Sequence, residues 1–250
     1  MVVFVPDDLS LVKGSPSTRR KFIDLELSKI SPIYAFYLAK YNRLLKERNQ
    51  YLKLLSKKNG KYDDYLETID EQMVDVQLKV IEKRENFIER LSKNVKDVYK
   101  SIADNEEYVD LHYLCFIKKK DKEELLKLYK KEFSRDLKYL STTHGIHKED
   151  MKIMIDRKSA HQYASQGQQR TIVLSIKIAL LELIKEEIGE YPILLLDDVL
   201  SELDDQRKTK LLDILNNRIQ TFITTTSIDG IEHHVIKEAK KININRKEKQ

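Results

Sequence analysis

The chain has 250 residues and a formal net charge of +5, with 35% charged residues, 8% aromatic residues and no Trp. That length provides for one large domain or two medium ones, and so high a charge content is typical of a helix-rich intracellular protein. No run approaches the roughly 18 apolar residues of a membrane-spanning helix, and no leader with a small-residue cleavage site opens the sequence, so we expect a cytoplasmic protein and no membrane partner.

Positive charge is distributed unevenly along the chain. Residues 16–58 hold eleven Lys and Arg against three Asp and Glu, so the remainder is net acidic. This imbalance indicates a polyanionic partner for the basic segment. Cys115 is the single cysteine, which excludes an internal disulfide, and its apolar neighbours Leu114 and Phe116 predict a packing role in a strand-like stretch.

The first predicted element is a buried strand at residues 2–5, which Pro6 ends. A helix then begins after Ser15, with Phe22, Ile23, Leu25 and Leu27 expected on its buried side. Its first turn carries Arg19 and Arg20, for which two interpretations stay open. The pair is either solvated or in contact with a phosphate or with a missing lobe of the protein, and the phosphate contact makes both residues candidates for DNA binding.

Two helices are predicted next. Apolar residues recur at helical spacing from Pro32 to the Asn-Gly turn at 59–60, and again at steps of three and four over residues 66–80. This pattern is typical of an antiparallel helix pair. Lys83 then occupies the next expected apolar position, and the pattern resumes at Phe87. The slip predicts a compact helical lobe in place of a long rod.

Residues 107–117 read as a strand, residues 121–140 as a helix and residues 151–155 as a second strand that re-enters the sheet begun by residues 2–5. We therefore expect a split α/β core with a large inserted α-helical lobe. The intervening His144 and His147 do not predict a metal site, because no third ligand with suitable spacing follows them.

A candidate anion site opens the next helix. Ser165, Gln166, Gly167 and Gln168 precede an apolar stripe at three- and four-residue spacing. Free N–H groups, the helix dipole and the Ser165 hydroxyl converge at such a helix start, and Gly167 allows a phosphate to approach the backbone.

A pair of carboxylates follows a buried strand. Residues 193–196 form an unbroken apolar run, and Asp197 and Asp198 come directly after it. Carboxylates at the carboxyl end of a parallel strand can hold the magnesium that accompanies a phosphate. Asp204 is expected to cap a helix whose leucines face inward, and residues 221–225 to form another buried strand. The sequence ends in a basic stretch, which we expect to be frayed.

These motifs stand in the order of the signature, Walker B and D-loop segments of ABC-type ATPases. Within that superfamily the sequence YASQGQQRT followed by LLLDDVLSELD most resembles the RecF family, as do the segments at 6–20, 42–49 and 147–150. The resemblance thus covers nearly the whole chain. It does not extend to a phosphate loop: no two of the six glycines lie five residues apart, so G-x-x-x-x-G-K-[ST] is absent. In the family that loop lies upstream of the segment where this chain begins, so we expect a C-terminal portion.

The resemblance implies a fold and a set of sites. The fold is an ABC-ATPase-like core divided into residues 1–30, the end of the first part of the ATPase lobe, residues 31–140, the helical insertion, and residues 141–250, the rest of the lobe. Asp197 would position Mg²⁺, and Asp198 stands where a Glu usually activates water. Relatives often place a His after the last strand to contact the γ-phosphate, but here Thr225 and Thr226 occupy that place. The γ-phosphate sensor is therefore in doubt, because His233 and His234 lie too far along the chain to replace it. The D-loop would be formed by Ser201, Glu202, Leu203 and Asp204.

The function implied is ATP-dependent DNA binding in recombinational repair and replication. Such a protein acts at single-strand gaps and gapped duplex DNA with RecR and RecO, helps to load RecA and contributes to SOS induction. It forms a homodimer around ATP and hydrolyses the ATP slowly. In this chain the residues that would face the partner's ATP are Ser165, Gln166, Gly167 and Gln168. One alternative is an inactive fragment or a helical scaffold, because the phosphate loop is lacking. The other is an ABC transporter cassette, which the long helical insertion disfavours.

Overall fold

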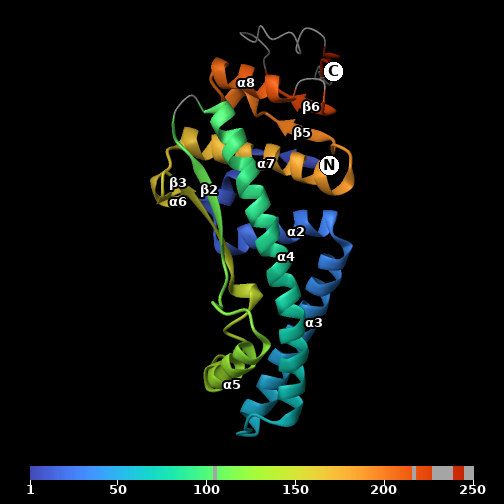
Figure 1. Ribbon diagram of the computed structural model, residues 1–250, viewed down its shortest axis with the longest axis vertical. Helices are drawn as coiled ribbons and strands as arrows, with labels where there is room; N and C mark the ends of the chain where they lie inside the picture. The colour runs from blue at the N-terminus through green and yellow to red at the C-terminus, as the bar shows by residue number, and fades with distance from the viewer. Residues whose placement is uncertain (104–105, 216–217, 227–238, 245–250) are drawn as a thin grey trace, which may run out of the picture.

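The computed structural model describes residues 1–103, 106–215, 218–226 and 239–244. His233, His234 and most of the predicted basic C-terminal stretch lie outside these residues. The molecule is elongated, with a small sheet and its helices at one end and an arm of long helices reaching the other (Figure 1). Every helix in the described part of the chain is too short or too polar to cross a membrane.

A parallel three-stranded sheet lies at the upper end in Figure 1. Its strands are β1 (Val2–Phe4), β5 (Leu194–Asp197) and β6 (Thr221–Thr224), in the order β1-β5-β6. Leu194 pairs with Val2 on one side and Thr221 on the other, so β5 is the central strand and its Leu194 and Leu196 are buried. The strands expected at residues 2–5 and 193–196 are confirmed. The strand expected at residues 221–225 forms as β6, but its predicted burial is wrong, because β6 lies at the edge of the sheet and Phe222 is 54% exposed.

Short helices connect β1 to the arm. These are η1 (Pro6–Leu9), α1 (Ser10–Lys13) and α2 (Pro16–Ile30), and α2 begins after Ser15 as expected. Phe22, Ile23 and Leu27 are buried, but Leu25 is 58% exposed, so its predicted inward position is wrong. The buried face follows steps of three and four, and the position beside Leu27 on that face belongs to Glu26, whose carboxylate pairs with Lys29 at 2.8 Å.

The arm is built from three helices. These are α3 (Pro32–Lys57), α4 (Asp64–Ile102) and α5 (Lys122–Tyr139), and the 39 residues of α4 run without interruption from the tip of the arm to the sheet (Figure 1). The prediction of a compact lobe broken near Lys83 is therefore wrong. Lys83 is exposed, and the buried position belongs to Arg84, which is 2% exposed and pairs with Asp24 and Glu149.

A buried polar cluster sets the orientation of the arm helices. Arg48 of α3 donates from Nε to Asp70 Oδ1 of α4 at 2.5 Å and from Nη1 to Asp136 Oδ2 of α5 at 2.6 Å. All three side chains are at most 1% exposed. Charges without access to water must stay paired, so this cluster fixes which face of α3 points inward.

A second sheet is antiparallel and runs along the side of α4. It consists of β2 (Val109–Leu114), β3 (Asp150–Ile155) and β4 (Lys158–Ser159), in the order β2-β3-β4. The strand predicted at 151–155 therefore forms but does not enter the β1-β5-β6 sheet. Its alternation of buried Met151, Ile153 and Ile155 with exposed Lys152 is typical of an antiparallel sheet with one open face.

The remaining elements complete the upper end. They are η2 (Ile146–Lys148), α6 (Ala160–Tyr163), α7 (Gln166–Ile188), η3 (Leu200–Glu202) and α8 (Asp205–Leu215). The predicted inward leucines of α8 are buried: Leu211, Leu212 and Leu215. Helix α7 packs against α4 and β1.

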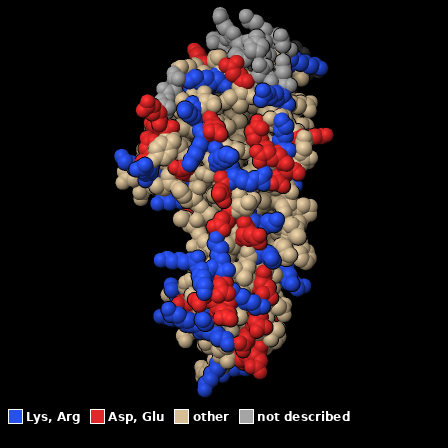
Figure 2. Space-filling view, in the orientation of Figure 1, with Lys and Arg blue, Asp and Glu red and all other residues tan. Residues whose placement is uncertain are grey.

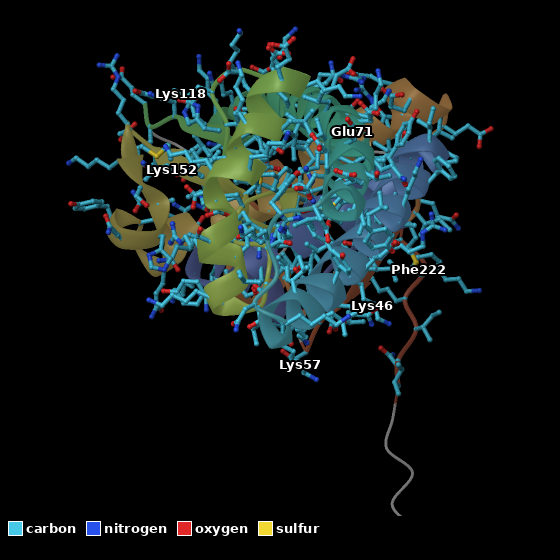
Figure 3. The ribbon with its side chains drawn as sticks, turned by 90° about the horizontal axis from the view of Figure 1, so that it is seen from below. Lys46, Lys57, Glu71, Lys118, Lys152 and Phe222 are labelled. Carbon is cyan, nitrogen blue, oxygen red and sulfur yellow. The ribbon has the colours of Figure 1, made fainter. Side chains whose placement is uncertain are left out.

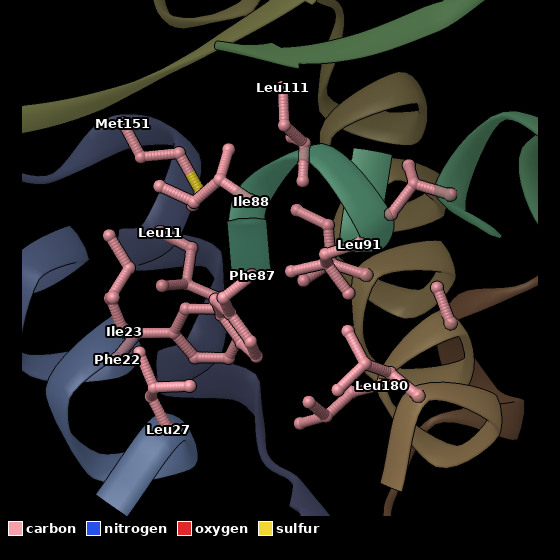
Figure 4. Packing of buried hydrophobic residues seen from close by; sticks show 14 of the residues in the cluster. Leu11, Phe22, Ile23, Leu27, Phe87, Ile88, Leu91, Leu111, Met151 and Leu180 are labelled. Atoms are coloured by element: carbon pink, nitrogen blue, oxygen red, sulfur yellow. The ribbon is translucent and has the colours of Figure 1, made fainter. Parts of the chain in front are cut away.

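One core joins these layers. Figure 4 shows Phe22 and Leu27 of α2 meeting Phe87 and Leu91 of α4, with Leu180 of α7 close by. Leu111 and Met151 reach the same cluster from the second sheet. Helix α4 thus packs directly against β2 of the second sheet and against α7 and α8 beside the first sheet.

Candidate nucleotide site

Asp197 and Asp198 lie where β5 ends, as the sequence predicts. Asp197 is exposed, and its Oδ1 accepts a hydrogen bond of 2.5 Å from the Thr224 hydroxyl on β6. Asp198 has a left-handed backbone (φ 52°), and its N–H donates to the Thr224 carbonyl and hydroxyl oxygens, each at 3.1 Å. Because a positive φ is unusual outside glycine, pairing with Thr224 is what holds the turn that separates the two carboxylates.

The donor set at this strand end suits magnesium. Asp198 Oδ1 is buried and has no hydrogen-bond partner among the described residues, whereas its neighbour Asp197 is open to solvent. Mg²⁺ prefers oxygen ligands and is held by one or two carboxylates together with water and substrate phosphates. The described residues hold no cluster of three or more ligand side chains that could bind a metal by themselves. The exposed Asp197 therefore fits the ion as a partial ligand.

The predicted anion site is the capped start of α7. Ser165 is the N-cap: its Oγ accepts from the Gln168 N–H at 3.2 Å, and Gln168 Oε1 accepts from the Ser165 N–H at 2.7 Å. This reciprocal capping box fixes the loop before the helix begins. Ser165 and Gln166 are exposed, so the positive end of a 23-residue helix faces solvent.

Two contacts that the sequence did not reveal hold this loop. Gln168 Nε2 donates to Glu107 Oε1 at 2.7 Å, and the Tyr99 hydroxyl at the end of α4 donates to Glu107 Oε2 at 2.9 Å. Arg207 of α8 lies over Gly167, where an added Cβ would come within 3.6 Å of its Nη1. Glu107 and Arg207 are remote from the loop in sequence, so no local pattern could have indicated them.

The predicted D-loop, residues 201–204, follows the carboxylates. Ser201 Oγ donates to the Asp198 carbonyl at 2.8 Å, and Leu203 is buried. Asp204 caps α8 as predicted, with its Oδ1 accepting from the Arg207 N–H at 2.9 Å, and its Oδ2 lies 3.5 Å from Arg207 Nη1. Arg207 thus pairs with Asp204 and lies near Gly167. No hydrogen bond or ion pair of the described residues joins the loop at 165–168 to Asp197 or Asp198.

Arg19 has an internal structural role. The residue is 8% exposed, and its guanidinium makes a two-point contact with Asp150 (2.7 and 2.8 Å) and donates to the Gly14 carbonyl at 2.8 Å. A guanidinium engaged in this way has little capacity left for DNA, which argues against the expected phosphate contact of this residue. Arg20 is partly exposed and donates to the Glu149 carbonyl at 2.7 Å.

The segment at 147–150 anchors three helices. Asp150 pairs with Arg19 of α2, Glu149 with Arg84 of α4, and the His147 Nδ1 accepts from the Tyr41 hydroxyl of α3 at 2.6 Å. Burial lowers the pKa of His147 to about 4. Both histidines of this region are thus in hydrogen-bonded protein contacts, since His144 Nδ1 lies 3.1 Å from Thr143 Oγ1.

Cys115 lies just after β2 and packs against the main core. Burial raises the pKa of its thiol to about 12. A thiol with so high a pKa is almost wholly protonated at neutral pH, which supports the packing role expected from the sequence.

No family model matches the chain. It is 44% identical over 255 residues to the DNA replication and repair protein RecF of Staphylococcus carnosus, and 43% identical to that of Staphylococcus aureus. Both alignments cover 99% of this chain and 69% of the relative. The chain belongs to the RecF family. A solved RecF structure with ATP, described as a recombination mediator of the RecFOR pathway, agrees with the fold at a TM-score of 0.82 and 38% identity.

The RecF relatives are longer than this chain. The match covers 91% of this chain but 62% of the ATP-bound RecF structure, and 63% of a second RecF structure with an ATP analogue. The ABC-ATPase type of fold expected from the signature and strand motifs is thus confirmed over the part that the two share.

Proposed function

We propose that this chain forms part of an ATP-dependent DNA-binding protein of recombinational repair and replication, acting in the cytoplasm at single-strand gaps. RecR and RecO are its proposed partners, and loading of RecA is the proposed outcome. Family membership supports this function, since the relatives are named DNA replication and repair proteins and the solved RecF structures are described as recombination mediators of the RecFOR pathway. The division of the chain at about residues 30 and 140 remains part of the same proposal.

The exposed, capped start of α7 is the observation that carries the mechanism. Ser165, Gln166, Gly167 and Gln168 offer a helix N-terminus to solvent, yet among the described residues no hydrogen bond or ion pair joins them to Asp197 or Asp198. An anion-binding helix start separated from its own magnesium ligands suits a site completed by a second subunit. We infer that this loop faces the γ-phosphate of ATP held by the other subunit of a homodimer.

The residues at the strand end have distinct proposed roles. Asp197 would position Mg²⁺, which neutralises phosphate charge when bound. Asp198 would orient the attacking water, and its buried, unpartnered Oδ1 is the atom available for that hydrogen bond. Its side chain is shorter than the Glu usual in ABC ATPases, which supports a slow switch over rapid hydrolysis. Ser201, Glu202, Leu203 and Asp204 would form the D-loop beside this site.

Substitution of Ser165 tests the proposal. A chimera that joins the uncovered part of the S. carnosus relative to this chain supplies a complete protein. Ser165→Arg and Ser165→Ala both lose the N-cap, at about 1 kcal/mol each. Only the arginine adds a bulky cation where the partner's phosphate would lie. We expect Ser165→Ala to dimerise with a slowly hydrolysed ATP analogue in analytical ultracentrifugation, and Ser165→Arg to stay monomeric. Dimerisation of the Ser165→Arg protein would show that the signature assignment is wrong.

A further inference from the structure

The outward face of α3 carries a basic strip. With 3.6 residues per turn, six residues lie within about one third of the helix circumference. They are three cations and three amides: Lys46, Lys53, Lys57, Asn42, Asn49 and Gln50. We call these six residues the α3 strip. Most of them border a shallow groove along the helix, and no Asp or Glu occurs among them.

The rotation of α3 is fixed by the opposite side of the helix. Arg48 lies about 200° around the helix from Lys46 and is held in the buried cluster with Asp70 and Asp136. The lysines of the strip therefore face away from the other arm helices, while Asn49 lies at the edge of the strip, where its Oδ1 accepts from the Thr142 N–H and hydroxyl, each at 2.7 Å. Figure 3 shows Lys46 and Lys57 on the side of the arm opposite to Glu71.

The cations of the strip have no carboxylate partners among the described residues. Lysines on the other side of the arm do: Lys130 pairs with Glu67 at 2.5 Å and Lys122 with Asp75 at 2.8 Å. Lys120 also pairs with Glu85. The nearest acid on α3 is Glu47, which lies outside the strip and accepts a hydrogen bond from Tyr65. Figure 2 shows Lys and Arg side chains lying among Asp and Glu side chains on one face of the arm. The charges of Lys120, Lys122 and Lys130 are neutralised by ion pairs, whereas those of Lys46, Lys53 and Lys57 stay available to a ligand.

This placement accounts for the uneven charge of residues 16–58. Three of the eleven cations are used internally, because Arg19 pairs with Asp150, Lys29 with Glu26, and Arg48 with Asp70. The cations that remain are concentrated on α3, and its exposed Arg43 adjoins the strip. Much of the charge excess therefore lies on α3.

We propose that the α3 strip binds the phosphate backbone of duplex DNA. The inference rests on the proposed function and assigns it a surface. Lysine and amide side chains are the usual donors to phosphate oxygens. Lys46 and Lys57 lie about 16 Å apart along the axis, which equals about five phosphate steps of one strand. The strip holds no aromatic ring on which an unpaired base could stack, so its chemistry favours a duplex over a single strand.

Neutralising the strip tests the proposal in the 250-residue chain. The triple variant Lys46→Gln, Lys53→Gln, Lys57→Gln is compared with the matched control Lys120→Gln, Lys122→Gln, Lys130→Gln, which removes three ion-paired charges. Fluorescence anisotropy with a duplex of about 30 base pairs is measured between about 50 and 200 mM salt. We expect the strip variant to bind the duplex at least about tenfold more weakly than the unchanged chain. The slope of the logarithm of the binding constant against the logarithm of the salt concentration should fall in magnitude by about 2.7, or about 0.9 for each lysine removed. The control should bind within about threefold of the unchanged chain.

Each result has one meaning. Equal binding by the strip variant and the unchanged chain would overturn the assignment of the strip while leaving DNA binding intact. Equal losses in the two triple variants would overturn it as well, because only total charge would matter. A loss confined to single-stranded DNA would overturn the choice of a duplex. If neither the chain nor the ATP-loaded chimera bound DNA, the proposed function itself would fail, and the strip with it.

Discussion

His147 illustrates how a single side chain acquires its role from residues that are distant in sequence. The pattern His144-Gly-Ile-His147 suggests a metal ligand when it is considered alone, and only the lack of a third ligand argued otherwise. In the fold the His147 Nε2 lies 3.0 Å from the Thr142 carbonyl and therefore donates, while Nδ1 accepts from Tyr41. The ring is thereby held neutral. Tyr41 comes from α3, so the sequence offered no sign of this partnership.

The buried His147 should make stability depend on pH. Its pKa is lowered from 6.5 to about 4 by burial, so below about pH 6.5 the unfolded chain binds a proton that the folded chain does not. Stability should therefore fall as the pH drops from about 6.5 to about 4. From pH 7 to pH 5 the chain should lose about 2 kcal/mol more than His147→Gln, measured by urea unfolding. Parallel pH profiles for the two proteins would contradict this account.

At the scale of elements, the sequence predicted correctly the features that neighbouring residues determine by themselves. The apolar run before Asp197, the Ser165 helix start and the Asp204 cap all form as expected, because each depends on residues within one turn or strand. Helix α4 was misjudged because its continuity depends on Arg84. The partners that allow a charge at that core position, Asp24 and Glu149, come from elsewhere in the chain.

Two arginines of α4 provide a matched test of that explanation. Arg84→Met leaves the buried Glu149 without its cation and should destabilise the fold by about 3–5 kcal/mol. Arg90 is 35% exposed in its pairs with Glu186 and Glu187, so Arg90→Met should cost less than about 1 kcal/mol. Urea unfolding of both variants gives the comparison. Similar losses would show that the buried pairs do not sustain α4.

At the scale of the whole molecule, the sequence did not predict which strands pair with each other in the two sheets. Strand β3 was identified, but its partner β2 is set by packing against α4, and a strand pattern does not name its neighbour. The main core extends from β1 to α5, and a smaller cluster of Leu52, Leu55 and Leu66 lies in the arm. Because α3 and α4 run through both clusters, we expect them to unfold together.

Tryptophan reporters can test this cooperativity, because the chain has no Trp of its own. Phe133→Trp places a reporter beside the smaller cluster, and Phe222→Trp places one on β6. The fluorescence transitions in urea should coincide with each other and with the loss of helical circular dichroism. An earlier transition for Phe133→Trp would show that the arm opens independently of the sheet.

The unbroken course of α4 also makes it a lever. With 39 residues the helix is about 58 Å long, and its last turn holds Tyr99, which is hydrogen-bonded through Glu107 to the loop before α7. A stiff rod turns a small tilt at one end into a large displacement at the other. A tilt of about 10° at Tyr99 would move the far end of the arm by about 10 Å, given that length. A ligand at the loop 165–168 that tilts α4 would therefore displace the far tip of the arm much more than it displaces Tyr99.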